Sequence, residues 1–600
     1  MKMRLQEILF PKKDEYARAW KLFYHGMGVI YRDRAVKMAP CSQIDYMSYF
    51  NAFSLEKWKT YTCVKNISLV LIIEGAFRIR LVGYSLNVCS PVRTVLGTYD
   101  YDLKEKTEIR FEYPKTEDTM LAFEIETNSV CKLYSGGYEG ECDSQKIQEV
   151  NLFLATTTFK KETFIERNLE LLKEEILNTQ DEMKENFSIH VIDNGRTLEA
   201  EKLEQERVFI HSNKNVGGSG GFARGMIEAL KSEKIVTHIL LMDDDILILP
   251  ESIKRTYRLL KVLKPEYRER FISGAMLCYE QMNIQHEDIG FVHKDGSYGP
   301  LKGRLDHNFV VDNLRCEKEY LPKQDMYAGW WYCCIPMEAI KKNGLPLPLF
   351  VRGDDVEFSL RNHAGFITMN GISVWHLGFT YKFNAAVELY QVHRNSLILQ
   401  AVSGVCQNID FMDRMRKLFR ARILSLDYSG AELILDAIED FLKGPAFIQQ
   451  DCGEHIMKEK ASKNEAMKPL KEFSNIDIDL DTVYYDPPRG FARKWLYRLT
   501  YNGHRFCPSA LLRKGPGIVA YDWFYSPEHN FWRKELLAVN PHLETGHLRI
   551  HSKKKYRTLL KRYKELIRQY HAAHIQIEEQ YKQAYDFLRS IDFWESYLEI

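Results

Sequence analysis

No long hydrophobic run and no CxxC cysteine pair occurs in this chain of 600 residues, although Cys333 and Cys334 are adjacent. No stretch approaches the roughly 20 apolar residues that a membrane-spanning helix needs, and Met1–Leu5 lacks the apolar core of a secretory signal. The 12 cysteines follow no repeated spacing and form no CxxC pair, so we expect reduced thiols and no structural zinc site. These absences predict a cytoplasmic protein.

An excess of charge of one sign is also missing. The formal net charge is +1, with 83 Lys and Arg against 82 Asp and Glu, so no global field favours a nucleic-acid partner. With 45% hydrophobic and 28% charged residues, the composition is typical of a folded globular protein. The length is too great for one hydrophobic core and predicts a multidomain chain.

Residues 1–148 are rich in strand patterns. In 68–82, Phe77, Ile79 and Leu81 alternate with arginines, and further strands are expected at 107–113 and 120–125. Short antiparallel strands without helical periods predict an N-terminal β-sandwich module. Such a module could bind glycan or support the next domain, and the sequence leaves this open.

Strands and helices alternate over 149–400, which predicts a central Rossmann-like α/β domain. Strands are expected at 150–155, 189–192, 208–210 and 235–242, with helices at 164–177 and 217–230. This order implies a mostly parallel sheet whose ligands bind beyond the carboxyl ends of the strands.

Residues 401–600 form a C-terminal, mostly helical region with long amphipathic stretches. In 553–570, apolar residues keep a helical period while Lys and Arg crowd the opposite face. A solvated helix face and attraction to an anionic membrane surface both explain this pattern.

Three consecutive carboxylates, Asp243, Asp244 and Asp245, directly follow the apolar strand that ends at Met242. Adjacent carboxylates repel one another, and a divalent cation that carries a phosphate-bearing ligand would neutralise them. A solvated acidic turn is the alternative for an isolated triplet, but the neighbouring motifs favour the metal site.

The segment 215–225 opens a helix with four glycines in five residues. Glycine allows a ligand to approach the backbone, and a helix amino terminus favours anions. The spacing fits neither the G-x-G-x-x-G fingerprint nor a P-loop.

Three further motifs suggest catalysis and binding. The pair Asp354–Asp355 suits a general base, and either carboxylate could also, or only, cap the following helix. His376 follows a predicted strand after both acidic motifs, which favours metal ligation over simple packing. Trp330–Trp331 could form a sugar-binding platform or belong to the core.

The order of the motifs TTF, DNG, NVGGSGGFARG, DDD, GWW, DDVEF and VWH resembles that of family 2 inverting glycosyltransferases with the GT-A fold. More narrowly, it is similar to the bacterial galactofuranosyltransferases of the mycobacterial galactan type. The likeness is strong over 149–400 and looser on either side.

The resemblance implies a role for each matching position. Asp355 would be the general base, assisted by Asp354, and a Mn²⁺ or Mg²⁺ ion would be held by Asp243, Asp245 and His376. The residues expected along the nucleotide sugar are Thr158, Lys161, Asp193, Asn194, Asn215, Gly217, Gly218, Asp244 and Arg394. Those expected near the acceptor are Trp330, Trp331, Glu357 and His393.

The implied activity is transfer of galactofuranose from UDP-galactofuranose to a cell-surface glycan or lipid-linked acceptor. Gly353 and Lys161 depart from the family's usual Trp and Arg, so the reaction class is better supported than the acceptor. Three alternatives remain: another donor such as UDP-galactose, UDP-glucose or dTDP-rhamnose, a nucleotidyltransferase, and a non-catalytic glycan-binding scaffold. A peripheral position on the inner membrane face and a homo-oligomer are left open.

Overall fold

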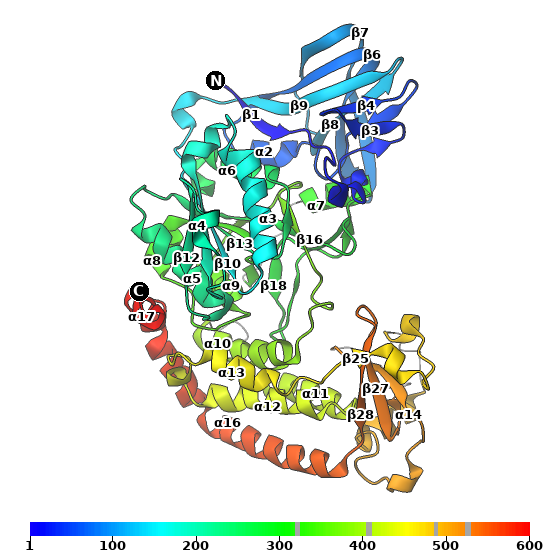
Figure 1. Cartoon of the computed structure of the whole chain (residues 1–600), viewed down its shortest axis with the longest axis vertical. Coiled ribbons are helices and arrows are strands. Elements are labelled where there is room, and N and C mark those ends of the chain that lie inside the picture. Colours follow the sequence, from blue (N-terminus) through cyan, green and yellow to red (C-terminus); the bar gives the residue numbers. More distant parts are fainter. Residues whose placement is uncertain (319–324, 404–410, 485–489, 523–529) are drawn as a thin grey trace.

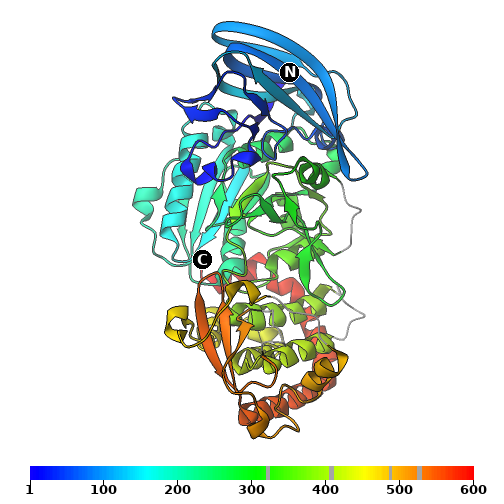
Figure 2. The same cartoon turned by 90° about the vertical axis from the view of Figure 1, so that its right-hand side faces the viewer.

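The computed structural model describes residues 1–318, 325–403, 411–484, 490–522 and 530–600. A β-rich part and a mostly helical part lie at opposite ends of the molecule, with an α/β part between them (Figures 1 and 2). The predicted mixed α/β, multidomain organisation is confirmed.

The N-terminal strands form one hydrogen-bonded sheet in the order β2-β5-β8-β6-β9-β4-β3, with β1 beside β9 and β7 beside β6. Its strands are β1 (Lys2–Glu7), β2 (His25–Gly26), β3 (Val29–Arg32), β4 (Ala35–Met38), β5 (Gln43–Asp45), β6 (Lys65–Asn87), β7 (Ser90–Glu112), β8 (Met120–Thr127) and β9 (Cys131–Glu141).

Strand β6 changes partner along its length. Its first half pairs with β9 and its second half with β8, while β7 follows it throughout. The change falls at Gly75, whose φ of +115° and close approach to Cys131 exclude a side chain. The predicted alternation is confirmed, since Phe77, Ile79 and Leu81 are fully buried.

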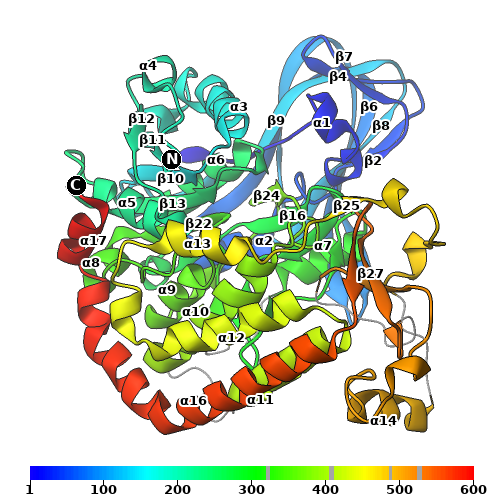
Figure 3. The same cartoon turned by 60° about the horizontal axis from the view of Figure 1, so that its bottom comes forward.

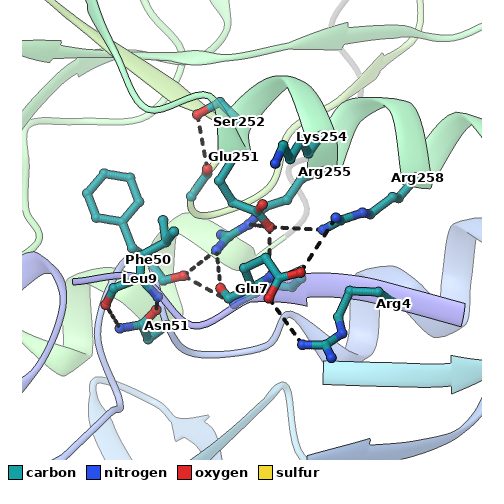
Figure 4. Close-up of polar contacts among 12 residues, drawn as sticks. Arg4, Glu7, Leu9, Phe50, Asn51, Glu251, Ser252, Lys254, Arg255 and Arg258 are labelled. Carbon is teal, nitrogen blue, oxygen red and sulfur yellow. Dashed lines mark hydrogen bonds and ion pairs between the residues drawn. The ribbon is translucent and has the colours of Figure 1, made fainter. Parts of the chain in front are cut away.

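The N-terminal sheet is attached to helix α6 (Glu251–Lys261) by a buried charged network (Figure 4). The Glu251 carboxylate accepts from the Glu7 N–H at 2.8 Å and pairs with Arg255 and Arg258. Arg255 also donates to the carbonyl of Phe50 at 2.7 Å. Because these charges are removed from water, each depends on its partners, and the network ties the first strand to the central part.

The central sheet has the order β12-β11-β10-β13-β22-β15-β23. Strands β10 to β13 run parallel, and β22 is antiparallel to β13. The strands are β10 (Leu152–Thr158), β11 (Phe187–Asp193), β12 (Val208–Ser212), β13 (His238–Asp243), β15 (Phe271–Ser273), β22 (Tyr332–Pro336) and β23 (Phe366–Ile367). The connecting helices include α3 (Glu162–Leu172) and α5 (Gly217–Lys231), close to the predicted ranges.

Two smaller sheets and further helices, among them α4 (Ala200–Leu203) and α7 (Val310–Glu317), belong to the central part. The five-stranded sheet comprises β14 (Leu247–Ile248), β16 (Ala275–Cys278), β17 (Ile284–Glu287), β20 (Leu305–Asp306) and β24 (Ser373–His376). The three-stranded sheet comprises β18 (Gly290–Val292), β19 (Tyr298–Pro300) and β21 (Met326–Tyr327). Helices α8 (Met337–Asn343) and α9 (Asp354–Arg361) also belong to it.

The C-terminal part is mostly helical, as predicted, and also contains a four-stranded sheet that the sequence did not indicate. Its helices are α10 (Val392–Ser403), α11 (Phe411–Leu424), α12 (Tyr428–Leu442), α13 (Gly453–Ala461), α14 (Phe491–Leu499), α16 (Lys553–Leu588) and α17 (Ile591–Leu598). Its strands are β25 (Lys468–Pro469), β26 (Gly517–Ala520), β27 (Glu535–Asn540) and β28 (Thr545–Ile550).

Helix α16 runs along the edge of the helical part (Figure 3). Tyr556, Leu559, Leu566 and Tyr570 are buried in the same core cluster as residues of α12, so the predicted apolar face is a packing face. Among the described residues, no helix combines the length and apolar character needed to cross a bilayer.

Candidate active site

Several of the predicted nucleotide-binding residues lie at the carboxyl ends of neighbouring strands. In the register of the sheet, Thr158 of β10 lies opposite Asp193 of β11, and Thr157 lies opposite Asp243 of β13. Parallel strands bring their carboxyl ends to one edge. The predicted edge therefore exists, and Thr158, Asp193 and Asp243 share it.

Asp243, Asp245 and His376 lie close enough together to hold one ion. Their candidate ligand atoms are all within 4.8 Å of one another. His376 Nε2 lies 3.9 Å from Asp243 Oδ2 and 3.3 Å from Asp245 Oδ1. Two carboxylate oxygens and one imidazole nitrogen fit Mn²⁺ or Mg²⁺ better than the thiolate-rich sets typical of structural zinc.

Two lysines also reach this cluster. Lys161 Nζ lies 2.8 Å from Asp245 Oδ2 and 3.2 Å from Asp244 Oδ1. Lys382 pairs with Asp245, and its Nζ lies 3.1 Å from His376 Nε2. Burial opposes the ionisation of Asp245, but the three basic neighbours lower its pKa. The edge therefore holds positive charge beside the candidate ligands, where a diphosphate could also bind.

Asp244 is paired with Lys161, which also contacts Asp245. Burial raises the pKa of Asp244, and the Lys161 charge opposes that rise. The Asp244 main-chain carbonyl accepts from the Asn168 side chain at 3.1 Å, which fixes the turn after β13.

Asp193 and Asn194 are engaged in holding the turns of this edge. The Asp193 carboxylate accepts from the main-chain N–H groups of Gly195, Thr197 and Leu198 at 2.8–3.0 Å. Asn194 donates to the Gly217 carbonyl at 3.0 Å, and its own N–H donates to the Thr158 carbonyl. Both side chains are buried, so their contacts organise the loops from which a nucleotide would be bound.

The glycines at the start of α5 differ in what surrounds them. A Cβ at Gly217 would lie 2.1 Å from the Phe350 carbonyl oxygen, whereas a Cβ at Gly218 would meet no atom within 4 Å. Gly217 therefore allows α5 to pack closely against the loop before α9. Gly218, in contrast, has open space beside it. Asn215 accepts from the Gly217 N–H at 3.3 Å and shapes this turn.

Asp354 and Asp355 begin helix α9 after an unusual loop. Phe350, Arg352 and Gly353 have φ values of 70°, 69° and 84°, a left-handed conformation that non-glycine residues rarely adopt. Gly353 takes the N-cap position and no side chain caps the helix. Neither Asp354 nor Asp355 takes the N-cap position itself, but Asp355 Oδ1 accepts from the Val356 N–H in the first turn at 2.8 Å, and a loop delivers the two carboxylates.

Asn395 and Arg394 hold that loop in place. The Asn395 amide donates to the carbonyls of Leu349, Val351 and Arg352 at 2.7–3.1 Å. Arg394 is buried and donates to the Leu349 carbonyl at 3.0 Å. Arg394 was expected to contact diphosphate or acceptor, and its guanidinium instead binds protein backbone.

The two carboxylates of α9 are shifted toward the protonated form. Burial and the adjacent Asp355 charge raise the pKa of Asp354 to about 8. Burial raises the pKa of Asp355 to about 6, with Asp243 adding to the shift and Arg352 opposing it. Because Asp243 acts on both, the pair lies within electrostatic reach of the candidate metal ligands, and Asp355 has the properties of a general base near neutral pH.

Trp330 and Trp331 are buried. They therefore belong to the core and do not form the sugar-binding platform that was the other possibility. Trp330 packs between Phe222 of α5 and Phe358 of α9 at ring distances of 5.3 and 5.7 Å. Trp331 donates to the Gly274 carbonyl at 3.0 Å. Neither ring offers an open platform, and Trp330 instead links the glycine-rich helix to α9.

Glu357 and His393 are buried as well. The Glu357 carboxylate accepts from Tyr585 of α16 and pairs with Arg361 at 3.2 Å. Burial lowers the pKa of His393 well below its usual value, and nearby arginines add to the effect. Glu357 of α9 is thus held by its two partners, and His393 of α10 is enclosed in the interior, so neither lies at a surface where the predicted acceptor would contact it.

Glu287 and Lys382 belong to the site and were missed from the sequence. Burial, followed by the charge of Asp355, raises the pKa of Glu287 to about 8. Tyr327 donates to the Glu287 carboxylate at 3.4 Å. Glu287 ends the short strand β17 without a motif around it, and Lys382 lies six residues after His376, so neither gave a sequence signal.

The family model "Galactofuranosyltransferase 2 N-terminal" matches residues 5–140. Galactofuranosyltransferase GlfT2 of Mycobacterium tuberculosis (strain ATCC 25618 / H37Rv) is 28% identical over 435 residues, covering 68% of this chain and 66% of that protein. GlfT2 of Mycolicibacterium smegmatis (strain ATCC 700084 / mc(2)155) is 27% identical over 438 residues, with the same coverage. The chain resembles the galactofuranosyltransferases.

The predicted resemblance is thus confirmed, and it extends to the N-terminal sheet. The chain spans 66% of the length of these two galactofuranosyltransferases. Among solved structures, the mannosyltransferase PcManGT from Pyrobaculum calidifontis in complex with GDP-Man and Mn²⁺ aligns with a TM-score of 0.26 and 11% identity, over 59% of this chain and 85% of that one. A likeness of that size supports no inference about this chain.

Proposed function

We propose that this chain is a metal-dependent, inverting glycosyltransferase that transfers galactofuranose from UDP-galactofuranose to a glycan or lipid-linked glycan. In this proposal 149–400 is the GT-A catalytic domain, 1–148 is a β-sandwich module and 401–600 is a helical domain. The resemblance to galactofuranosyltransferases supports the reaction class and the donor.

One observation carries the proposal. The candidate metal ligands Asp243, Asp245 and His376 lie within 4.8 Å of one another, and the charge of Asp243 adds to the raised pKa of both carboxyl groups on α9. A glycosyl transfer needs both parts at once: charge stabilisation for the departing diphosphate and a base for the attacking hydroxyl. A scaffold that only binds glycan would need neither.

Each group has a defined task in a single displacement. A divalent ion bound by the three ligands would neutralise the diphosphate as it leaves. Lys161 and Lys382 would add positive charge on the same side, and Gly218 would let the donor approach the backbone. Asp355 would accept the proton of the acceptor hydroxyl, so that the anomeric configuration inverts, while the protonated Asp354 avoids a second adjacent negative charge.

The acceptor and the location are part of the same proposal. We expect a cytoplasmic protein at the inner face of the membrane that meets a lipid-linked glycan there. We also propose a homo-oligomer, in which several active sites would lie on one surface.

Donor turnover tests the proposal. Purified full-length protein with Mn²⁺ is assayed for UDP release from UDP-galactofuranose, UDP-galactopyranose and UDP-glucose, with alkyl galactofuranosides as acceptors. We expect selective release from UDP-galactofuranose, lost after chelation and in Asp243→Ala. Asp413→Ala, an exposed carboxylate on α11, is the matched control. Release from another donor would overturn the galactofuranosyl assignment, and no release from any donor would overturn the enzyme assignment.

A further inference from the structure

The loop that follows the candidate ligand His376 connects the metal site to the C-terminal part. It runs from residue 377 to 384, after the end of β24, and contains no helix or strand. Lys382 lies within it, and the lysine ammonium pairs with Asp245. The position of this loop therefore decides whether a lysine lies beside the candidate metal ligands.

The central part holds the beginning of the loop. The Gly378 N–H donates to the Glu280 carboxylate at 3.1 Å. The Phe379 ring lies 4.5 Å from the Arg352 guanidinium and 5.2 Å from the His286 ring. These contacts fix the loop as far as Phe379, three residues before Lys382.

The C-terminal sheet holds the middle of the loop. Tyr381 stacks on His542, which lies in the turn between β27 and β28, with ring centroids 4.1 Å apart and planes inclined by 26°. Phe383 meets Tyr521, directly after β26, edge to face at 5.2 Å. Figure 1 shows the turn between β27 and β28 at the end of that sheet which faces the central part. Both chain neighbours of Lys382 therefore contact the C-terminal sheet.

The end of the loop is held by Asn464, which precedes β25. Its side-chain oxygen accepts from the Ala386 N–H at 3.0 Å, and its amide group donates to Asn384 Oδ1 at 3.0 Å. The C-terminal part thus contacts the loop at three successive positions on either side of and after Lys382.

His542 contacts the loop without belonging to a core. The residue is exposed in its turn, whereas the buried residues packed within the sheet include Ala520, Leu537 and Val539. Stacked rings at this distance attract each other beyond the area that they bury. Removing the His542 ring should therefore release the loop and leave the packing of the sheet intact.

We propose that the C-terminal sheet is a latch on the 377–384 loop, with His542 as a positioning residue that acts through Tyr381 on Lys382. The latched lysine lies against Asp245, where it opposes binding of a free metal ion and adds positive charge for the diphosphate of the donor. This inference rests on the proposed function, because it concerns how the same site receives the metal ion and the nucleotide.

The latch predicts opposite changes for the two ligands in His542→Ala. Mn²⁺ alone should bind more tightly, by up to the roughly fivefold expected for Lys382→Met, because the lysine competes less often. UDP in the presence of saturating Mn²⁺ should bind roughly two- to tenfold more weakly, the range that one aromatic pair covers. Isothermal titration of the full-length protein measures both affinities. A loosened protein would instead bind both ligands more weakly.

Three further variants isolate the role of the ring. His542→Phe keeps a stacking ring and should restore both affinities to those of the parent. His547→Ala on β28 removes a bond to the Ala466 carbonyl, and His547 makes no ring contact with the loop among the described residues, so it should leave both unchanged. In a Lys382→Met background, His542→Ala should change neither affinity, because the residue that the latch positions is gone.

The results separate the latch from the proposed activity. Unchanged affinities in His542→Ala, a parallel weakening of both, or the same shifts in the Lys382→Met background would overturn the latch. The predicted shifts in a protein that transfers no sugar would contradict the function and leave the latch standing. Transfer of galactofuranose by a protein without these shifts would support the function and contradict the latch.

Discussion

Tyr585 on α16 donates a hydrogen bond to Glu357 on α9, although 228 residues separate them in the chain. Glu357 lies two residues after Asp355 and is fully buried, with Arg361 as its ion-pair partner. The last long helix of the chain is thereby joined to the helix that carries the proposed base. The C-terminal part thus supports the helix that carries the proposed base.

Removing that hydroxyl should cost stability. In Tyr585→Phe a buried carboxylate loses its donor, and we expect the free energy of unfolding to fall by about 1–3 kcal/mol. Urea denaturation of the full-length protein measures this. Tyr581→Phe on the same helix is the control, because its buried hydroxyl has no hydrogen-bond partner among the described residues. Equal losses in the two variants would contradict the account.

Asn395 should matter for the rate more than for donor binding. Asn395→Ala removes the donor that holds three carbonyls of the left-handed loop before Asp354. We expect kcat to fall by roughly tenfold or more because the base moves from its position, while KM for the nucleotide sugar changes little. Ser396→Ala, which loses a bond to the preceding helical turn and one with the Tyr298 hydroxyl but none to the left-handed loop, should keep the parent's kcat. A change confined to KM would contradict this role.

Lys382 should compete with the metal ion. Its ammonium pairs with Asp245 and contacts His376, two of the three candidate ligands. In Lys382→Met we expect Mn²⁺ to bind roughly fivefold more tightly, which corresponds to about 1 kcal/mol for a partly exposed ion pair. Isothermal titration of Mn²⁺ measures this. Lys341→Met is the unchanged control, because Lys341 pairs with Glu338 on the exposed face of α8 and contacts none of the candidate ligands among the ion pairs of the described residues. Weaker Mn²⁺ binding in Lys382→Met would show that the lysine supports the metal site.

Asp354 should make the protein less stable as the pH rises. Its pKa is raised from 3.8 to about 8 in the folded chain. Below about pH 4 both states carry the proton, whereas at higher pH the unfolded chain ionises first, so stability falls until about pH 8 and then levels off. Asp354→Asn cannot ionise and should gain roughly 1–3 kcal/mol over the parent at about pH 8 and nothing at about pH 4. Urea denaturation across this range measures the difference.

Asp413 is the control, because its pKa is shifted in the opposite direction to that of Asp354. Hydrogen bonds from Lys417 and Arg416 lower the pKa of Asp413, so its ionised form is favoured by folding. Asp413→Asn should therefore gain no stability as the pH rises. A gain of the same size in both variants would mean that the effect does not come from burial of Asp354.

The sequence predicted the sheet edge well because strand ends are marked locally. The strand before Asp243 and the helix after Gly217 were both recognisable from a few adjacent residues. The partners of buried side chains were not, because they come from distant segments. Glu357 pairs with Tyr585, and Arg394 with the carbonyl of Leu349, so no local pattern distinguishes these supports from ligand contacts.

The C-terminal sheet was missed for a related reason. Its strands β25 and β26 have two and four residues, too short for a period of two to stand out between helical patterns. Strand β26 pairs in parallel with β27 across a connection that no adjacent turn signals. Such pairing is determined by tertiary packing, which cannot be predicted from local periodicity in the sequence.

The most direct measurement is single-turnover transfer from UDP-galactofuranose to an alkyl galactofuranoside, with the product analysed by mass spectrometry and NMR. The account predicts addition of a galactofuranose with inverted anomeric configuration, and loss of that product in Asp355→Asn while Mn²⁺ and UDP still bind. A product with retained configuration, or full transfer by Asp355→Asn, would contradict the assignment of Asp355 as the base of an inverting galactofuranosyltransferase.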